Sequence, residues 1–346
     1  MSAPAPAAAA VRVRPLPPDA LRPPAPLDPT APAYKDWFHV NVFDHVGGTV
    51  GLLNVSLHGP PGDARSRAVG AALFDVPGSG WVGNLVVRAM DEAAIGTTSI
   101  GLDCIGLAVD HRTGTLSAAA DLHGDRCRLR LTAKGSDALA VERPLPLGSG
   151  WISWYVAPRL QSTGSLRIGD ASVPLDGASA YHDHNWGRWH WGDDFGWDWG
   201  SFATPPPGPT VVLARTADRS RRRPGPPTLL IVGEGFQRRF GGRTIQIRQQ
   251  GRLAGPLRRL PGAMAALRPD RASPSLPAHV RVVADDGMDR VELDFTARSA
   301  AQLVLADPIR RGHSFVHEST GTFTLAARVG GADWHGSGLA VVEHVD

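Results

Sequence analysis

The segment YHDHNWGRWHWGDDFGWDWGSF, which runs from Tyr181 to Phe202, concentrates aromatic and titratable side chains. It holds five of the ten tryptophans of the chain, three of its thirteen histidines and four aspartates. Burying so many polar groups is costly unless each of them has a partner or a task. The segment is therefore expected to be a metal site, an acid–base site with an aromatic lining, or a tightly packed hairpin.

The beginning of this segment, AYHDHNWG, has the alternation of a β-strand. Successive side chains of a strand point to opposite faces. One predicted face is rich in histidine and carries His182, His184 and Trp186. The other face carries a carboxyl group and consists of Tyr181, Asp183 and Asn185.

A second strand is predicted over GWDWGSF, with Trp197 and Trp199 on one face and Asp198 on the other. The stretch GRWHWGDDFG between the two strands indicates a loop that is hinged at Gly187 and Gly196. If the two strands pair, the tryptophans approach the histidines of the first strand, and the two strand aspartates lie close together.

Short alternating segments of the same kind recur outward from this region, from Trp37 onward. They include FHVNVFDHV, GLLNVSLHG, LSAAADLHGDRCRLRLTAKG, TLLIVGEGF, DRVELDFTAR and GSGLAVVEHV. Forty glycines and thirty prolines favour short strands joined by turns, and no segment predicts a helix longer than a turn or two. The sequence therefore predicts an all-β protein of antiparallel barrels, a fold in which about eight to ten strands can enclose a small ligand.

The length of 346 residues suggests two domains, at roughly 150 residues per domain. The polar, proline-rich and arginine-rich stretch Asp218–Pro227 is the best boundary between them. The predicted domains are residues 34–218, which carry the tryptophan-rich segment, and residues 219–346. Residues 1–33 contain ten prolines and predict a disordered Pro/Ala-rich arm.

The cellular location is expected to be cytoplasmic. The first residues lack the charged start and long apolar centre of a signal peptide, and no apolar run approaches the length of a membrane span. Two cysteines are too few for a disulfide scaffold.

Positive charge is concentrated between Arg215 and Arg271, where fourteen arginines stand against three acidic residues. This basic segment is either a solvated surface or a contact for phosphates or an anionic membrane surface, so peripheral membrane association is one expectation. No aromatic-rich RNA-binding signature or zinc-finger spacing accompanies it, and nucleic acid is not an expected partner.

Two kinds of chemistry fit the tryptophan-rich segment. In a metal site, His182 and His184 would chelate the ion together with His190, Asp193 or Asp194. However, two histidines two residues apart are a weak signal, and the favoured interpretation has no metal and no cofactor.

The favoured interpretation is an acid–base site, because a carboxyl group among tryptophans is desolvated, and desolvation raises its pKa. Such a group can stay protonated near neutral pH and act as a general acid. Asp183 or Asp198 would supply the proton, and His182 and His184 would tune it. Aromatic faces stabilise a developing carbocation, so the expected substrate is an isoprenoid or polyene; its predicted contacts are Tyr181, Trp186, Trp189, Trp191, Trp197 and Trp199.

The alternative to chemistry is packing, since tryptophan and histidine often lie beneath a hairpin with their N–H groups bonded to carbonyls. Glu318 and Glu343 interrupt apolar C-terminal strand patterns, and they point either into a barrel or outward. The motifs GxSxG, the P-loop and GxGxxG at the start of a helix are absent, which removes the main support for hydrolase, NTPase and dinucleotide-enzyme functions.

The stretches LDGASAYHDHNWG, GWDWGSF and TVVLART resemble the signature of the carotenoid 1,2-hydratase (hydroxyneurosporene synthase, AttH-type) family. The early YKDWFHVNVFD and the late SFVHESTGTFTLAARVGG are similar in placement, so the resemblance extends over most of the chain from Tyr34. It implies two consecutive lipocalin-like β-barrels with a ligand cavity near their interface.

The resemblance also implies activity. Its members include a cofactor-independent hydratase that adds water to a terminal isoprenoid double bond, and related proteins catalyse cyclisations, including Diels–Alder reactions. The histidine and tryptophan of the family motif fall on His184 and Trp186, and its following tryptophan pair falls on Trp197 and Trp199. The tyrosine and aspartate associated with hydration have no counterpart in TPPPGPTVVLAR. A hydratase or cyclase, a pericyclase and a non-catalytic binder of hydrophobic ligands are therefore the three functions to separate.

Overall fold

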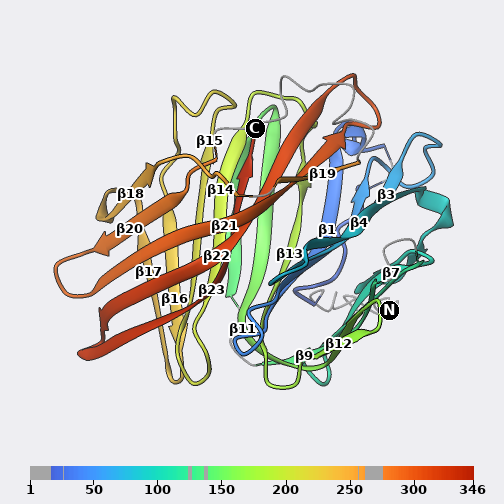
Figure 1. Ribbon diagram of the computed structural model, residues 1–346. Coiled ribbons are helices and arrows are strands. Elements are labelled where there is room, and N and C mark those ends of the chain that lie inside the picture. The colour runs from blue at the N-terminus through green and yellow to red at the C-terminus, as the bar shows by residue number, and fades with distance from the viewer. Residues whose placement is uncertain (1–16, 26, 124–126, 136–138, 256, 262–275) are drawn as a thin grey trace, which may run out of the picture.

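The computed structural model describes residues 17–25, 27–123, 127–135, 139–255, 257–261 and 276–346. The strands form two curled sheets, each shaped as a half-barrel, and both sheets are antiparallel except where β19 runs parallel to β21 (Figure 1). The predicted all-β fold of two lipocalin-like sheets is confirmed.

The first sheet, here called the N-terminal sheet, has the strand order β4-β3-β2-β1-β13-β11-β9-β8-β7-β6-β5, and β10 and β12 pair with β11. Its strands are β1 (Tyr34–Phe43), β2 (Val50–His58), β3 (Arg67–Val76), β4 (Gly80–Ala89), β5 (Ala94–Ile95), β6 (Ser99–Gly101), β7 (Ile105–Asp110), β8 (Thr115–Leu122), β9 (Cys127–Lys134), β10 (Leu139–Leu147), β11 (Gly150–Ile168), β12 (Ala171–Pro174) and β13 (Ser179–Arg188).

The second sheet, the C-terminal sheet, has the order β17-β16-β15-β14-β23-β22-β21-β20-β18, and β19 pairs with β21. Its strands are β14 (Gly196–Ala203), β15 (Thr210–Ala217), β16 (Thr228–Gly233), β17 (Phe236–Gly241), β18 (Ile245–Gln250), β19 (Leu257–Leu260), β20 (His279–Asp285), β21 (Arg290–Ala306), β22 (His313–Val329) and β23 (Ala332–Val345).

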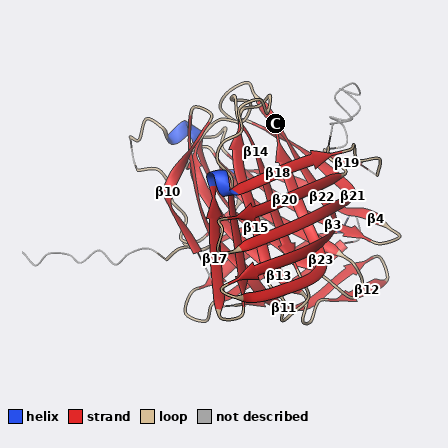
Figure 2. Cartoon of the chain, turned by 90° about the vertical axis from the view of Figure 1, so that its left-hand side faces the viewer, coloured by secondary structure: helices blue, strands red, loops and turns tan. Residues whose placement is uncertain are grey.

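Strands and loops account for nearly all of the described chain (Figure 2). The helices of the described residues are short 3-10 turns, namely η1 (Ala31–Ala33), η2 (Met90–Glu92) and η4 (Gly242–Thr244). None of the helices found in the described ranges has the length and apolar character needed to cross a bilayer.

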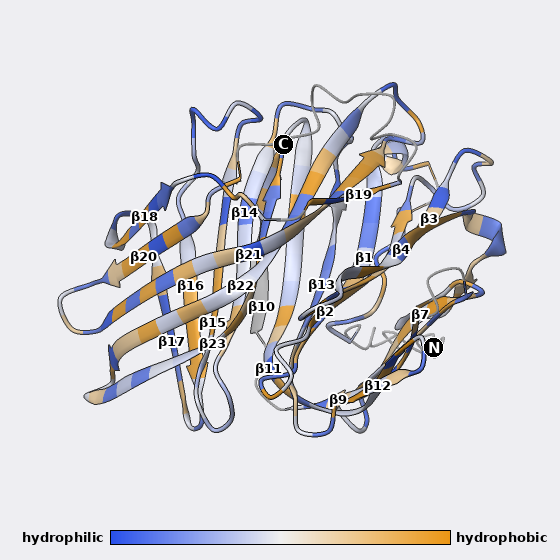
Figure 3. Ribbon diagram, in the orientation of Figure 1, coloured by the Kyte–Doolittle hydropathy of each residue, from blue (hydrophilic) through white to orange (hydrophobic). Residues whose placement is uncertain are grey.

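The burial of each strand shows where the cores lie. Strand β9 alternates strictly between buried and exposed residues, because one face covers a core and the other meets solvent. The same alternation of apolar and polar residues is visible along β20 and β21 in Figure 3. Strands β1, β2, β3 and β13 are instead buried on both faces. One face covers the core inside the N-terminal sheet, and the other faces the C-terminal sheet.

The chain crosses from one sheet to the other between β13 and β14. Strand β13 lies between β1 and β11, whereas β14 lies between β15 and β23. The pairing of these two strands, which the sequence left open, therefore does not occur. The predicted boundary at residues 218/219 also does not coincide with the change of sheet, because Asp218–Pro227 only connects β15 to β16 within the C-terminal sheet.

Packing and hydrogen bonds hold part of the crossover loop between β13 and β14 in place. Trp189 is fully buried and makes an edge contact with Trp37, with ring centroids 5.3 Å apart. Lys35 Nζ donates to the Trp189 carbonyl at 3.0 Å, and the Trp191 amide donates to Asp307 Oδ2 at 3.1 Å. The loop is thus held to the edges of both sheets.

The ordered chain begins before Tyr34, which corrects the predicted arm. Residues 1–16 lie outside the described residues, but the segment that follows them packs against the N-terminal sheet. Asp19, Ala20 and Leu21 are all buried, and the Leu21 amide donates to the carbonyl of Thr97 at 2.9 Å. Proline content predicted disorder here, but the burial of a leucine and of a paired aspartate offsets the entropy lost on ordering.

Candidate active site between the two sheets

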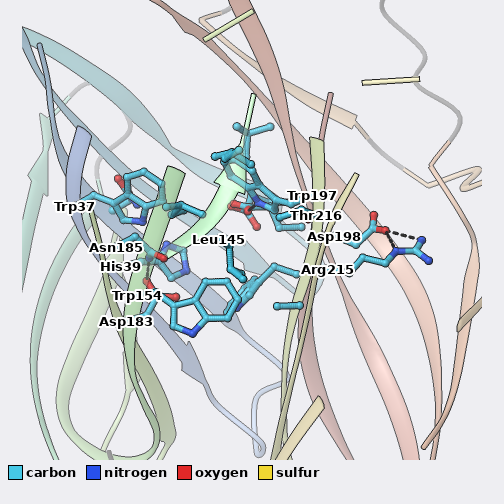
Figure 4. Close-up of a pocket in the computed structure, with 18 of the residues that line it drawn as sticks. Trp37, His39, Leu145, Trp154, Asp183, Asn185, Trp197, Asp198, Arg215 and Thr216 are labelled. Atoms are coloured by element: carbon cyan, nitrogen blue, oxygen red, sulfur yellow. Dashed lines mark hydrogen bonds and ion pairs between the residues drawn. The ribbon is translucent and has the colours of Figure 1, made fainter. Parts of the chain in front are cut away.

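A cavity of about 410 Å³ lies between the two sheets (Figure 4). The N-terminal sheet contributes to it the faces of β1, β2 and β13 that do not cover its own core. The C-terminal sheet contributes β14, β22 and β23. The wall is largely apolar and aromatic with a few carboxyl, imidazole and guanidinium groups; it includes Trp37, His39, His58, Trp154, Asp183, Asn185, Trp191, Trp197, Asp198, Trp199, Arg215, Arg239, Glu318 and Glu343.

Strand register explains why distant residues share this wall. Trp37 on β1 and Trp154 on β11 both pair with Asn185 of β13. One step along, His39 of β1 pairs with Asp183. Directly opposed residues of neighbouring strands point to the same face, so these side chains form two adjacent rows on the cavity side of the N-terminal sheet.

Asp183 is the acid of the N-terminal wall. Its side chain is buried, and it accepts hydrogen bonds from the Tyr181 hydroxyl at 2.7 Å and from Asn185 Nδ2 at 2.5 Å. Burial raises the pKa of Asp183 to about 7, because it outweighs the lowering by the Tyr181 hydrogen bond and by the charge of His182. A carboxyl with this pKa is substantially protonated near neutral pH and can act as a general acid.

Glu318 and Glu343 are the acids of the C-terminal wall. They are directly opposed on β22 and β23, and Glu343 is also opposed to Trp199 of β14. Trp197 Nε1 donates a hydrogen bond to Glu343. Burial, and after it the neighbouring carboxyl, raise the pKa of Glu318, and burial also raises the pKa of Glu343. Of the two directions that the sequence left open for these glutamates, the structure has the inward one.

Asp198 does not resemble an acid catalyst. It accepts hydrogen bonds from Arg215 Nε at 2.7 Å, from His344 Nδ1 at 2.6 Å and from Arg221. Burial alone would raise its pKa, but the hydrogen bond from His344 and the charges of Arg221 and Arg215 hold the pKa well below the usual range. Figure 4 shows its carboxyl turned toward Arg215 and away from Asp183. These contacts favour the ionised form of Asp198 and disfavour it as the source of the proton.

The histidines of the motif lie on the other face of β13, as the period of two predicted. His182 Nδ1 donates to the His39 carbonyl at 2.8 Å, and its Nε2 lies 3.0 Å from Asp19 Oδ1. His184 Nε2 lies 2.8 Å from Asp36 Oδ1. Both rings thus bind the N-terminal segment and β1, and neither lines the cavity. They influence Asp183 at most through their charge.

The predicted substrate contacts separate into two groups. Trp191, Trp197 and Trp199 line the cavity. Tyr181 is not among the lining residues, but its hydroxyl donates a hydrogen bond to Asp183, which is. Trp189 is packed in the crossover loop. Trp186 lies on the far face, where its ring is tilted by 38° against that of His184, with centroids 4.8 Å apart, and Arg22 lies over it at 5.4 Å.

Several cavity residues were not singled out from the sequence, notably Trp37, His39, His58 and Trp154. His39 contacts the ring of Trp199 at 5.6 Å, and burial lowers its pKa to about 4, so the imidazole is neutral at physiological pH. The alternation of YKDWFHVNVF was a usable signal for β1, but only strand pairing shows that it adjoins β13.

Within the described ranges, His, Cys, Asp and Glu side chains form no group of three or more that could hold a metal ion. His190, predicted as a further ligand, instead has its Nδ1 3.1 Å from Asp307 Oδ2. Asp193 accepts a hydrogen bond from the Ser149 hydroxyl at 2.5 Å, and Asp194 pairs with Arg223 at 3.2 Å.

The basic segment Arg215–Arg271 is partly neutralised by acidic side chains. Its residues 256 and 262–275 lie outside the described residues. Elsewhere in it arginine and aspartate pair repeatedly, as in Arg215 and Arg221 with Asp198, Arg223 with Asp218, and Arg238 with Asp286 and Asp289. Contact with an anionic membrane stays a prediction.

No protein-family model and no curated protein matches the sequence. Solved structures do match. An AttH-like protein from Nitrosomonas europaea has a TM-score of 0.65 at 14% identity, over 90% of this chain and 92% of that one. Kievitone hydratase from Nectria haematococca has a TM-score of 0.60 at 13% identity, over 89% of this chain and 88% of that one.

A structure of CghA with Sch210972 has a TM-score of 0.61 at 11% identity, over 91% of this chain and 89% of that chain. The three matches cover 89–91% of this chain, so they include strands of both sheets. At these identities the likeness establishes the fold. The chain has the two-sheet, lipocalin-like fold of the AttH-like proteins.

Proposed function

We propose that the inter-sheet cavity binds an apolar, unsaturated substrate of the isoprenoid or polyene class, and that Asp183 protonates a carbon–carbon double bond to start hydration or cyclisation. The observation that supports this proposal is the Asp183 carboxyl itself. It is a buried acid with a pKa of about 7 on the wall of an aromatic cavity. Asp198, which the sequence offered for the same role, takes no part in the proposed reaction.

An alkene is a weak base, so it needs an acid that is both protonated and positioned at the double bond; the raised pKa of Asp183 keeps a large share of its carboxyl protonated near neutral pH. A positioned carboxylic acid contributes typically 10²–10⁴-fold to such a proton transfer. The product of the transfer is a carbocation, which the faces of Trp199 and Trp197 stabilise by cation–π attraction. Water excluded from most of an aromatic cavity cannot quench this cation indiscriminately.

One of the structural relatives is named a hydratase, which agrees with this reaction class. Binding without chemistry is the second candidate, and it is favoured by one observation. His182 and His184, which the sequence suggested would tune the acid, lie on the other face of β13, so they do not contact a ligand in the cavity.

The deciding experiment is mass spectrometry of products after incubation with acyclic isoprenoids and polyenes in heavy water. A product heavier by one molecule of heavy water indicates hydration, and a product with one exchanged hydrogen indicates acid-driven cyclisation. Rearrangement without deuterium indicates a pericyclase, and unchanged but bound substrate indicates a binding protein.

The variant Asp183→Asn tests the assigned acid in the same assay. We expect at least a hundredfold loss of turnover with substrate binding retained. Asp333→Asn is the control, because Asp333 is an exposed residue of β23 that pairs with Arg328. Full turnover by Asp183→Asn overturns the proposal.

A further inference from the structure

Glu318 and Glu343 face the same cavity as Asp183 from the opposite sheet, and the proton transfer proposed above leaves them unused. The two residues are directly opposed on β22 and β23. The side chain of Glu318 is 3% exposed, and its Oε2 atom has no hydrogen-bond partner among the described residues. Such an oxygen on a cavity wall is placed to accept a hydrogen bond or an ionic contact from a bound ligand.

The pair has no cationic partner among the described residues. Two adjacent buried carboxyls cannot both ionise at neutral pH, so the free pair holds at least one proton, and a cation bound beside it would draw out a proton and leave negative charge on the pair. In the described part of the chain, no lysine or arginine forms an ion pair with either glutamate. Glu343 accepts a hydrogen bond from the Trp197 indole N–H, which is a neutral donor.

The surroundings of this charge are aromatic. Trp199 is opposed to Glu343 across the β14–β23 ladder, and Trp197 contacts it from the adjacent position. Both tryptophans line the cavity, as do Trp37 and Trp154 on the facing sheet. A negative charge surrounded by indole rings is the arrangement that recognises an organic cation, since ring faces attract positive charge and exclude water.

We propose that the Glu318–Glu343 pair is the counter-ion of a positively charged species formed in the cavity, and the base that ends the reaction. The proposal rests on the proposed function above and assigns its second half. It also predicts the ligand chemistry: the cavity prefers an apolar organic cation to a neutral molecule of the same shape.

Each proposed step conserves atoms and protons. Asp183 gives its proton to one alkene carbon, which forms a C–H bond and leaves a carbocation and an Asp183 carboxylate. In hydration, water forms a C–O bond with the cation and gives one proton to the glutamate pair. In cyclisation, a second double bond attacks the cation, and the pair removes a proton from the adjacent carbon. Transfer of this proton back to Asp183 restores the starting state, so the net change is one added water or none.

The test uses benzyltrimethylammonium and its neutral isostere neopentylbenzene, which differ by one nitrogen in place of one carbon. Titration calorimetry on the full chain gives the affinity for both. We expect the cation to bind about tenfold or more tightly than the isostere, as desolvated cation–π and ionic contacts imply. Ionising the pair fully should also release protons, which are detected by repeating the titration in buffers of different ionisation enthalpy.

The variant is Glu318→Gln, Glu343→Gln, which keeps the shape of the pair and removes its charge. Glu234→Gln, an exposed position in the turn between β16 and β17 of the same sheet, is the matched control. We expect the double variant to lose the preference for the cation and the proton release, and to bind neopentylbenzene as before. Retained binding of the isostere shows that the cavity is intact.

Equal affinity of the unaltered protein for the two ligands overturns the proposal, and so does a preference that survives in the double variant. Failure to bind either ligand overturns it as well. The proposed function is judged separately, because it depends on turnover by Asp183. Cation preference in a protein that never transforms a substrate would reject the reaction and keep the cation site.

Discussion

The Tyr181 hydroxyl donates a hydrogen bond of 2.7 Å to Asp183 Oδ2, and the two residues are neighbours on one face of the same strand. Positions i and i+2 of a strand share a face, so the motif itself brings a phenol against the acid. This hydrogen bond opposes the effect of burial on the pKa of Asp183, as do the charge of His182 and the hydrogen bond from Asn185.

Tyr181→Phe is expected to raise the pKa of Asp183, because the phenol stabilises the ionised carboxylate. A loss of one such hydrogen bond typically shifts a carboxyl by about one pH unit. In a pH profile of turnover, the alkaline limb, where the acid is lost, should move upward from about 7. Tyr155→Phe is the control, because Tyr155 pairs with His184 and so lies on the other face. An unchanged alkaline limb in Tyr181→Phe would contradict the assignment of Asp183.

Asp183→Asn is expected to stabilise the fold more at pH 8 than at pH 5. The folded-state pKa of Asp183 is raised to about 7, so its contribution is fully present below the unfolded pKa of about 4 and is lost as the pH rises through 7. The asparagine variant has no such loss. Urea unfolding of both proteins should show a difference that grows by about 2–4 kcal/mol between the two pH values. A pH-independent difference would show that the carboxyl is ionised throughout.

Asp198→Asn should lower stability and leave turnover per folded molecule unchanged. The carboxylate of Asp198 balances Arg215 and Arg221, whose side chains are 19% and 29% exposed. Removing one member of a buried ion pair costs about 3–5 kcal/mol, and the partial exposure of both arginines reduces this to about 2 kcal/mol. Thermal unfolding and the heavy-water product assay measure the two quantities. A hundredfold loss of turnover at unchanged stability would restore Asp198 as the acid.

The faces of β13 could be predicted from the sequence because they depend on local geometry alone. A period of two separates Asp183 from His182 and His184 whatever the strand pairs with. The partners of Asp198 could not be predicted in this way. Arg215 reaches it from the next strand, but His344 comes from the last strand of the chain, 146 residues away.

The acid pair on the opposite wall depended even more on long-range register. Glu318 and Glu343 become neighbours only because the long hairpin of β22 and β23 pairs them. Their apolar surroundings indicated that they were unusual, but alternation could not show which face of the strands was covered by the other sheet. In the same way, a crossover loop and a hairpin loop have similar composition. The sequence therefore left open whether β13 and β14 pair, and only the structure shows that they belong to different sheets.

Asp19→Asn is expected to release the segment Pro17–Arg22 from the N-terminal sheet. Burial alone would raise the Asp19 pKa, but the hydrogen bond and charge of His182 lower it, and the same pairing raises the pKa of His182 against the effect of burial. The contribution of Asp19 is lost as the pH falls through its lowered folded pKa. The contribution of His182 is complete below about pH 6.5 and is lost as the pH rises through its raised folded pKa.

Hydrogen exchange at the amides of Ala20 and Leu21 reports whether the segment is docked on the sheet. It should be slowest between about pH 4 and 6.5 in the unaltered protein, and about tenfold faster in Asp19→Asn. Asp28→Asn, which alters a half-buried aspartate bonded to Thr30, is the control and should leave both amides protected. Equal protection in Asp19→Asn would mean that Leu21 alone holds the segment and that His182 has no part in it.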